Sequence, residues 1–361
     1  MQARVWLLLI ASLASQLCAA YTWHLPRGFP TPAVPADNPM SDAKVALGQR
    51  LFFEPRLSVN GRYSCASCHE PARSFSDGRS VAVGATGQAL PHNAMALVNV
   101  AYNVSFGWTQ RHVRSLEAQM LQPMLNQHPV ELGLAGRQRS LCAQLAADPG
   151  YAADFAAAFP DEAHSASGTR GPVTFDHVVK AIAAFERTLI SGRSPFDRYV
   201  FGDDRSALSE SAKRGMALFY SARGGCAQCH SGLNFSGPLS YEGHTAERAS
   251  FANTGLYDVD GRGGYPAKDR GLIEFTHRAA DMGKFRVPTL RNVALTAPYM
   301  HDGSVASLDE VIDHYSRGGH RRPHQDSRVR PLQLSPAERT DLIAFLQSLT
   351  DREFIDDPRF R

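Results

Sequence analysis

Long apolar runs are scarce in this sequence. Beyond the first twenty residues no stretch is apolar enough to span a bilayer, so we expect no stable membrane insertion. An excess of one charge is also missing. The 38 lysines and arginines nearly balance the 35 aspartates and glutamates, leaving a net charge of +3. This balance gives no reason to expect nucleic acid as a partner.

The first twenty residues contain the one long apolar run. Arg4 supplies a positive start, an apolar run follows over 5–17, and Cys18 is followed by two alanines. This order is typical of a cleavable signal peptide, which we assign to residues 1–20. An uncleaved anchor is the alternative, but the run is short for a membrane span. Export through a signal peptide predicts a periplasmic protein.

Cysteine is rare, with six residues in the chain. Cys18 would leave with the signal peptide. Cys142 lies in an apolar helical stretch and is expected to be a small buried hydrophobic residue. The other four form two Cys-x-x-Cys-His motifs, which comprise Cys65, Cys68 and His69, and Cys226, Cys229 and His230.

The Cys-x-x-Cys-His motif is the attachment signal of c-type haem. The two thiols bond to the haem vinyl groups, and the histidine ligates the iron as the proximal ligand. A structural zinc site would need two further Cys or His ligands for each pair. A redox dithiol of the thioredoxin type would need a strand–helix–strand context, which is absent here. We therefore expect two covalently bound haem c groups.

The chain shows a weak internal repeat around these motifs. A Gly-x-x-Leu-Phe segment precedes each motif, at Gly48 and at Gly215, and an amphipathic helix ends each half. The repeat predicts a mainly α fold of two cytochrome c-like haem domains with long loop insertions. The expected boundaries are an extended arm over 21–40, an N-terminal domain over 41–204 and a C-terminal domain over 205–361.

Two connecting segments should be irregular. Proline and glycine mark a linker that begins at Ser191 and ends near Ser206. The many glycines in residues 231–285 predict that this segment is mostly loop.

Three segments resemble the bacterial dihaem cytochrome c peroxidase and MauG superfamily. They are Leu47–Ser58, Ser64–Glu70 and Val287–Ser304, and the resemblance extends from about residue 40 to 355. Within this superfamily, residues 128–133 and the helix over 178–190 look most similar to the MbnH-like enzymes. The resemblance implies that the first haem reacts with peroxide and that the second transfers and stores electrons.

The resemblance also implies an open first haem. Peroxidases with a closed resting state cap this haem with a histidine, and Ala85 stands at that position here. His92 is the nearest alternative ligand, or else a pocket or propionate contact.

Glu131 matches the family's distal glutamate. A buried carboxyl can take a proton from one peroxide oxygen and deliver it to the other. Gln119 and Pro123 match further distal-pocket positions. His128 either assists Glu131 or lies in solvent.

Tyr315 stands fourteen residues after His301, at the position of the distal ligand of the second haem. The resemblance associates methionine there with peroxidases and tyrosine with MauG. Methionine raises the potential of the haem, whereas an anionic phenolate stabilises oxidised iron. Met300 is the alternative ligand.

Trp108 matches the tryptophan between the two haems, where an indole can relay electrons. After signal removal Trp23 is the one other tryptophan. It is the sole tryptophan candidate for a surface relay, although tyrosines could substitute. The resemblance further implies a calcium ion between the domains, held by Asn93, Thr296 and Pro298.

Three functions follow as hypotheses. The first is a MauG/MbnH-like oxidase that uses hydrogen peroxide to form a high-valent haem state and oxidises a tryptophan of a periplasmic partner protein. The second is a cytochrome c peroxidase that reduces hydrogen peroxide with electrons from a small cytochrome or copper protein. The third is an electron-transfer cytochrome without catalysis, which would have two closed haems.

Overall fold

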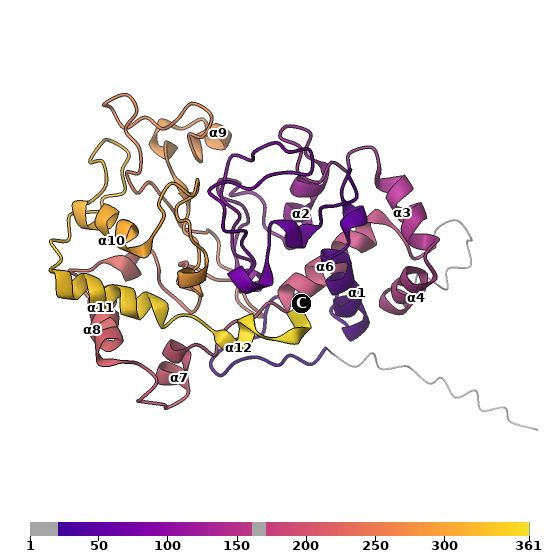
Figure 1. The fold of residues 1–361 in the computed structure, drawn as a ribbon, viewed down its shortest axis with the longest axis horizontal. Helices are drawn as coiled ribbons and strands as arrows, with labels where there is room; N and C mark the ends of the chain where they lie inside the picture. Colours follow the sequence, from indigo (N-terminus) through magenta and orange to yellow (C-terminus); the bar gives the residue numbers. More distant parts are fainter. Residues whose placement is uncertain (1–20, 161–170, 361) are drawn as a thin grey trace, which may run out of the picture.

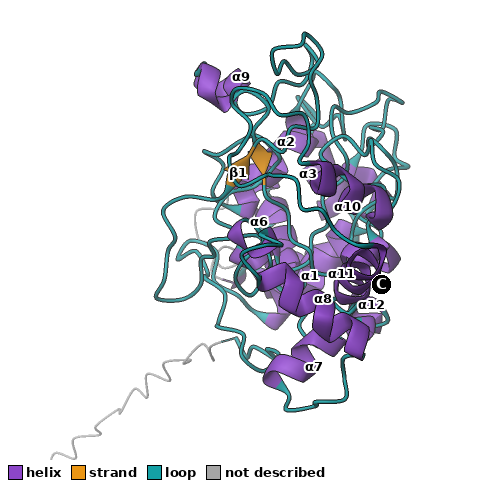
Figure 2. Ribbon diagram, turned by 90° about the vertical axis from the view of Figure 1, so that its left-hand side faces the viewer, coloured by secondary structure: helices purple, strands orange, loops and turns teal. Residues whose placement is uncertain are grey.

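The computed structural model describes residues 21–160 and 171–360, so the predicted signal peptide lies outside the described residues. Helices and loops predominate (Figure 2), and they form two lobes that lie side by side in Figure 1. In Figure 1 the right-hand lobe holds the helices before residue 190 and the left-hand lobe holds α8, α10 and α11. None of the helices in the described ranges combines the length and apolar character needed to span a bilayer.

The N-terminal lobe is built on two crossing helices. α1 begins after Ser41, whose hydroxyl accepts a hydrogen bond from the amide of Lys44. α1 crosses α6 at Gly48, where a Cβ atom would lie 1.9 Å from the carbonyl oxygen of Ala181. The repeated glycine therefore permits a close helix crossing. The helices of this lobe are α1 (Asp42–Phe52), α2 (Leu116–Leu125), α3 (Gln138–Ala146), α4 (Pro149–Ala158) and α6 (Phe175–Arg187).

The C-terminal lobe repeats this crossing. A Cβ atom at Gly215 on α8 would lie 1.9 Å from the carbonyl oxygen of Asp341 on α11. The two halves of the sequence repeat thus fold in the same way. The elements of this lobe are α8 (Glu210–Tyr220), α9 (Ile273–Thr276), α10 (Leu308–Arg317), α11 (Pro336–Gln347) and a small antiparallel sheet of β1 (Phe251–Ala252) and β2 (Phe285–Arg286).

The end of the chain returns to the N-terminal lobe. α12 (Arg352–Ile355) and the residues after it cross beneath that lobe, as the yellow end of the ribbon shows in Figure 1. The ring of Phe75 lies 6.0 Å from that of Phe354 and 6.4 Å from that of Phe360. Residues from the second sequence half therefore complete the core of the first lobe.

A buried polar network connects the segment before α12 to the chain around Ser191. One oxygen of the Asp351 carboxylate accepts hydrogen bonds from the amides of Gly192 (2.9 Å) and Arg193 (2.8 Å) and from the hydroxyl of Ser191 (3.1 Å). Asp351 and Ser191 are fully buried. Each buried acceptor here has its donors, as a stable buried polar group requires.

The two segments expected to be irregular behave differently. The glycine-rich segment 231–285 is mostly loop, as predicted. The expected linker instead contains α7 (Pro195–Phe201), which begins with a capping box between Ser194 and Asp197. Asp197 is buried because it pairs with Arg291, at 2.6 Å between carboxylate oxygen and guanidinium nitrogen. Cys142 is only partly buried rather than a core residue.

Candidate functional site

Each Cys-x-x-Cys-His motif forms a short 3-10 turn followed by a fixed histidine. The amide of His69 donates to the carbonyl of Cys65 (3.0 Å), and the amide of His230 donates to that of Cys226 (2.9 Å). Each turn thereby places two free thiols and one imidazole at one end of a helical segment. This is the local shape that the attachment of c-type haem requires.

The two imidazoles have the same second contact. The distance from Nδ1 to a backbone carbonyl is 2.8 Å in both, to Phe75 for His69 and to Phe235 for His230. This hydrogen bond assigns the proton to Nδ1 and leaves Nε2 as the lone-pair nitrogen for a metal. Burial lowers the pKa of both imidazoles, which keeps them neutral and able to ligate.

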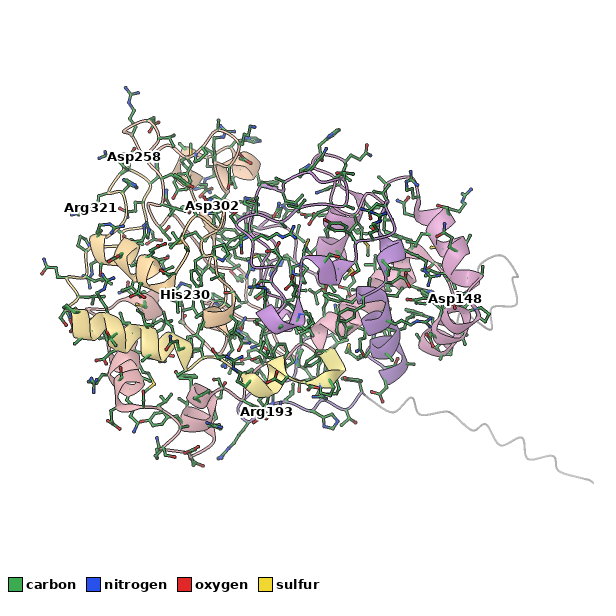
Figure 3. The ribbon with its side chains drawn as sticks, in the orientation of Figure 1. Asp148, Arg193, His230, Asp258, Asp302 and Arg321 are labelled. Atoms are coloured by element: carbon green, nitrogen blue, oxygen red, sulfur yellow. The ribbon has the colours of Figure 1, made fainter. Side chains whose placement is uncertain are left out.

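A cavity of about 250 Å³ opens next to the second motif, in the half of the molecule where Figure 3 labels His230. His230 and Cys229 line it together with Tyr315 from α10. Burial raises the pKa of the Tyr315 phenol, with the nearby thiols adding to the effect. Met300, the alternative ligand, lines the same cavity, so the cavity holds both candidate ligands of the second haem.

A buried arginine, which no sequence motif indicated, also lines this cavity. Arg286 on β2 is 8% exposed, and burial lowers its pKa to about 10. Its guanidinium donates to the carbonyl of Gly107 (3.0 Å) and lies 3.2 Å from the sulfur of Met95. Among residues 21–160 and 171–360, no carboxylate forms an ion pair with it. A buried cation without an anion is costly, so the cavity fits a ligand with negative charge, such as the propionates of haem.

The same cavity extends to the predicted bridging tryptophan. Trp108 is 9% exposed, and its indole nitrogen donates to the carbonyl of Asn93 (2.9 Å). The amide of Arg286 donates to the carbonyl of Trp108 (2.8 Å). Trp108 is therefore fixed from both lobes, and it lies between residues that follow the first motif and the wall of the second cavity.

The three predicted calcium ligands line this cavity as well. They are Asn93, Thr296 and Pro298. In the described residues no three His, Cys, Asp or Glu side chains come together as a metal site. A calcium ion there would depend on amide and carbonyl oxygens, which calcium accepts.

Glu131 and Ala85 lie together on the side of the first motif. The amide of Ala85 donates to the carbonyl of Glu131 (2.7 Å), and the charge of Glu131 acts on the thiols of Cys65 and Cys68. Burial raises the pKa of the Glu131 carboxyl to about 7. The pair therefore places a group that can exchange protons near neutral pH beside the first motif.

The helix α2 supports this side of the site. The carbonyl of Pro123 accepts a hydrogen bond from the amide of Leu132 (2.9 Å), which ties the segment after Glu131 to α2. Gln119 lies one helical turn before Pro123 and is partly buried. His128 is exposed, as the solvent alternative predicted.

His92 has a partner away from the first motif. Its Nε2 atom lies 3.0 Å from a carboxylate oxygen of Asp269, and the other oxygen of Asp269 lies 3.1 Å from Nε2 of His301. These contacts hold the pKa of Asp269 at about 2, although its burial acts in the opposite direction. The cluster joins the two lobes, and its carboxylate is far from His92 in sequence, so no local pattern indicated it.

Two family models match the chain. One, described as di-haem cytochrome c peroxidase, matches residues 42–205, and one described as cytochrome c matches residues 212–350. These matches confirm the prediction of a mainly helical fold with two cytochrome c-like domains.

Several known proteins are similar over nearly the whole chain. The methylamine utilization protein MauG of Methylorubrum extorquens is 39% identical over 87% of this chain and 80% of its own length. The cytochrome-c peroxidase IdrP1 of a Pseudomonas species is 37% identical over 97% of this chain and 94% of its own length. A crystal structure of a MauG-like protein associated with microbial copper homeostasis is 40% identical, with a TM-score of 0.90 over 95% of this chain and 99% of the other. This chain is therefore a peroxidase-type oxidoreductase that belongs to the di-haem cytochrome c peroxidase and MauG family.

Proposed function

We propose that the protein is an exported MauG/MbnH-like oxidase that uses hydrogen peroxide to oxidise a tryptophan of a partner protein in the periplasm. The observation that carries the proposal is the phenol of Tyr315 in the cavity beside His230. A tyrosine ligand stabilises oxidised iron, which suits a centre that stores an oxidising equivalent. The 40% identical MauG-like structure agrees with this choice.

The proposed functional residues belong to two sites, one at each haem-attachment motif. When bound, the haem groups supply the iron that reacts with peroxide and the store for one oxidising equivalent. His69 and His230 would hold them as proximal ligands, and the four motif cysteines would bond them covalently. Glu131 would move the peroxide proton, Gln119 on α2 would belong to the same distal pocket, and Tyr315 would close the second site as a ligand.

Two further groups lie between these sites. Trp108 relays electrons between the two sites. Its side chain lines the second cavity, and its indole nitrogen donates a hydrogen bond to the carbonyl of Asn93. A calcium ion held by Asn93, Thr296 and Pro298 would stabilise the contact between the lobes. Removal of calcium by a chelator should then weaken electron transfer between the haems without releasing either haem.

A second candidate function, that of a cytochrome c peroxidase, is supported by the relatives of this chain. Cytochrome-c peroxidases are among the relatives, and one of them covers 97% of this chain at 37% identity. In that function the oxidising equivalents would be consumed by electrons from a small cytochrome or copper protein.

Electron paramagnetic resonance of the ferric protein, before and after peroxide, separates these functions. The proposal expects an open first haem with one axial histidine, and a spectral response of both haems to peroxide. A first haem with two histidine ligands at rest would refute it. Rapid steady-state turnover with a reduced small donor protein would favour the peroxidase.

A further inference from the structure

An aromatic cluster leads from Trp108 toward the surface. The ring of His301 lies 6.5 Å from that of Trp108 and 6.4 Å from that of Tyr257. Tyr265 lies within the same cluster, 5.6 Å from Tyr257 and 6.4 Å from His301. These rings give a continuous contact path in which each step is short.

Tyr257 differs from Tyr265 in its hydrogen-bond partner. The Tyr257 hydroxyl donates to a carboxylate oxygen of Asp302, whereas the Tyr265 hydroxyl donates to the amide oxygen of Asn253 (2.9 Å). Oxidation of a phenol by one electron makes its proton strongly acidic. A carboxylate can accept that proton and an amide oxygen cannot, so Tyr257 is the tyrosine of this cluster suited to reversible oxidation.

Tyr257 also has access to solvent. It is partly exposed, and it precedes a loop in which Val259 is 61% exposed. Figure 3 labels Asp258, the next residue, near the outer edge of the molecule, whereas Asp302 lies farther inside. The phenol is therefore placed between the buried cluster and the surface.

We propose that Tyr257, with Asp302 as its proton acceptor, is a redox-active tyrosine through which an aromatic side chain of the partner protein is oxidised. This inference rests on the proposed function, because it names the exit from the same site. In the forward step Tyr257 gives one electron to the peroxide-oxidised enzyme, and its O–H bond breaks as the proton passes to Asp302. The resulting neutral tyrosyl radical takes an electron from the partner and recovers the proton from Asp302.

The electrons and protons balance over one turnover. Hydrogen peroxide takes two electrons and two protons to become two molecules of water. Two passages through Tyr257 supply the two electrons, and the twofold oxidation of the partner releases two protons. Tyr257 and Asp302 end each turnover in their starting states.

The chain offers a matched control. The Tyr151 hydroxyl also donates to a carboxylate, that of Glu54 (2.8 Å). However, Arg50 lies over the Tyr151 ring at 3.7 Å, and Arg56 holds the pKa of Glu54 at about 2. Both cations disfavour an oxidised tyrosine there, and Glu54 is a poor proton acceptor. Tyr151→Phe should therefore leave the radical unchanged.

The test uses the holoprotein with ring-deuterated tyrosine, mixed with peroxide and freeze-quenched for electron paramagnetic resonance. The wild type and Tyr151→Phe should show a tyrosyl signal, which Tyr257→Phe loses and Asp302→Asn reduces. The optical response of the haems to peroxide should persist in all four proteins. A tyrosyl signal that survives in Tyr257→Phe, or the absence of any tyrosyl signal in a wild type whose haems respond, would overturn the inference.

The optical response of the haems distinguishes failure of the proposed function from failure of the inference about Tyr257. Haems that do not respond to peroxide in the wild type would refute the proposed function, and the inference with it. If Tyr257→Phe does not fold, trapping of the wild-type radical with a nitroso spin trap gives the answer. Peptide mass spectrometry should then find the adduct on Tyr257, and an adduct confined to other residues would refute the inference.

Discussion

The most direct test of the first site is the replacement of Glu131 by glutamine. Burial raises the pKa of this carboxyl from 4.5 to about 7, which corresponds to about 3 kcal/mol in favour of the neutral acid. Glutamine keeps the shape and removes both the charge and the proton transfer. The variant should therefore keep its haem and lose its reaction with peroxide.

The pH dependence of the peroxide reaction follows from this pKa. The carboxylate must take the proton of peroxide, so the rate should rise through pH 7 and level off about one pH unit above it. Stopped-flow absorbance of the haems over pH 5–9 measures this rise. In Glu131→Gln the rate should fall by about 10²- to 10⁴-fold, the usual contribution of a positioned base, and the rise at pH 7 should vanish.

The stability of the protein provides a second readout with a definite sign. Between the ordinary pKa of glutamate and pH 7, the unfolded state loses the Glu131 proton while the folded state keeps it. Stability should therefore fall across this range, by up to about 3 kcal/mol from this one group. Glu131→Gln should remove that loss, so that the variant unfolds at a higher denaturant concentration than the wild type above pH 7.

A second buried carboxyl serves as the control. Burial raises the pKa of Glu186 on α6 to about 8, and its charge acts on Cys65 of the same motif. Glu186→Gln should leave the transition at pH 7 unchanged. A wild-type rate in Glu131→Gln, or a transition that disappears with Glu186→Gln instead, would refute the assignment of Glu131.

Three further predictions concern the scaffold and the second site. Gly48→Ala and Gly215→Ala would each place a methyl group 1.9 Å from a carbonyl oxygen. Calorimetry should show that each substitution destabilises its lobe by about 1–3 kcal/mol. Gly171→Ala is the control, because a Cβ atom there meets no atom within 4 Å and the substitution should be neutral. Tyr315→Met should raise the reduction potential of the second haem in a redox titration, and an unchanged potential would exclude Tyr315 as its ligand. Asp351→Asn replaces an oxygen that accepts three hydrogen bonds. The substitution should lower the free energy of unfolding by about 1–3 kcal/mol in a denaturant titration. An unchanged midpoint of unfolding would contradict this expectation.

Local signals in the sequence determined much of the scaffold. The serine that caps α1 and the two haem-attachment motifs act on residues that are close to them in sequence, whereas the glycine of each helix crossing meets a distant segment. Periodicity and spacing therefore predicted the helix that ends each half and the two haem-attachment motifs, but not the crossing of the helices. α7 was missed because Pro195 and Gly202 read as loop residues, although proline is favoured in the first turn of a helix and Gly202 ends this one.

Contacts between distant segments could not be predicted in this way. Asp351 meets the amides of Gly192 and Arg193 only because the chain end returns to the first lobe. Asp269 bridges two histidines from different lobes for the same reason. Arg286 directly precedes the segment 287–304 that resembles the family, yet only the structure shows that it is buried in the cavity wall without a carboxylate partner among the described residues.

The repeat restricts where the two haem sites can differ. Asn99 and Asn292 occupy equivalent places, each with a left-handed backbone at φ 58° and an amide hydrogen bond to a leucine carbonyl, at Leu189 and Leu349. The proximal histidines also share the same carbonyl contact at the same distance. Because the proximal sides are built alike, a difference in reactivity between the haems must come from the opposite side. We expect the first lobe to offer Ala85, which cannot ligate iron, and the neighbouring Glu131 there, and the second lobe to offer the phenol of Tyr315.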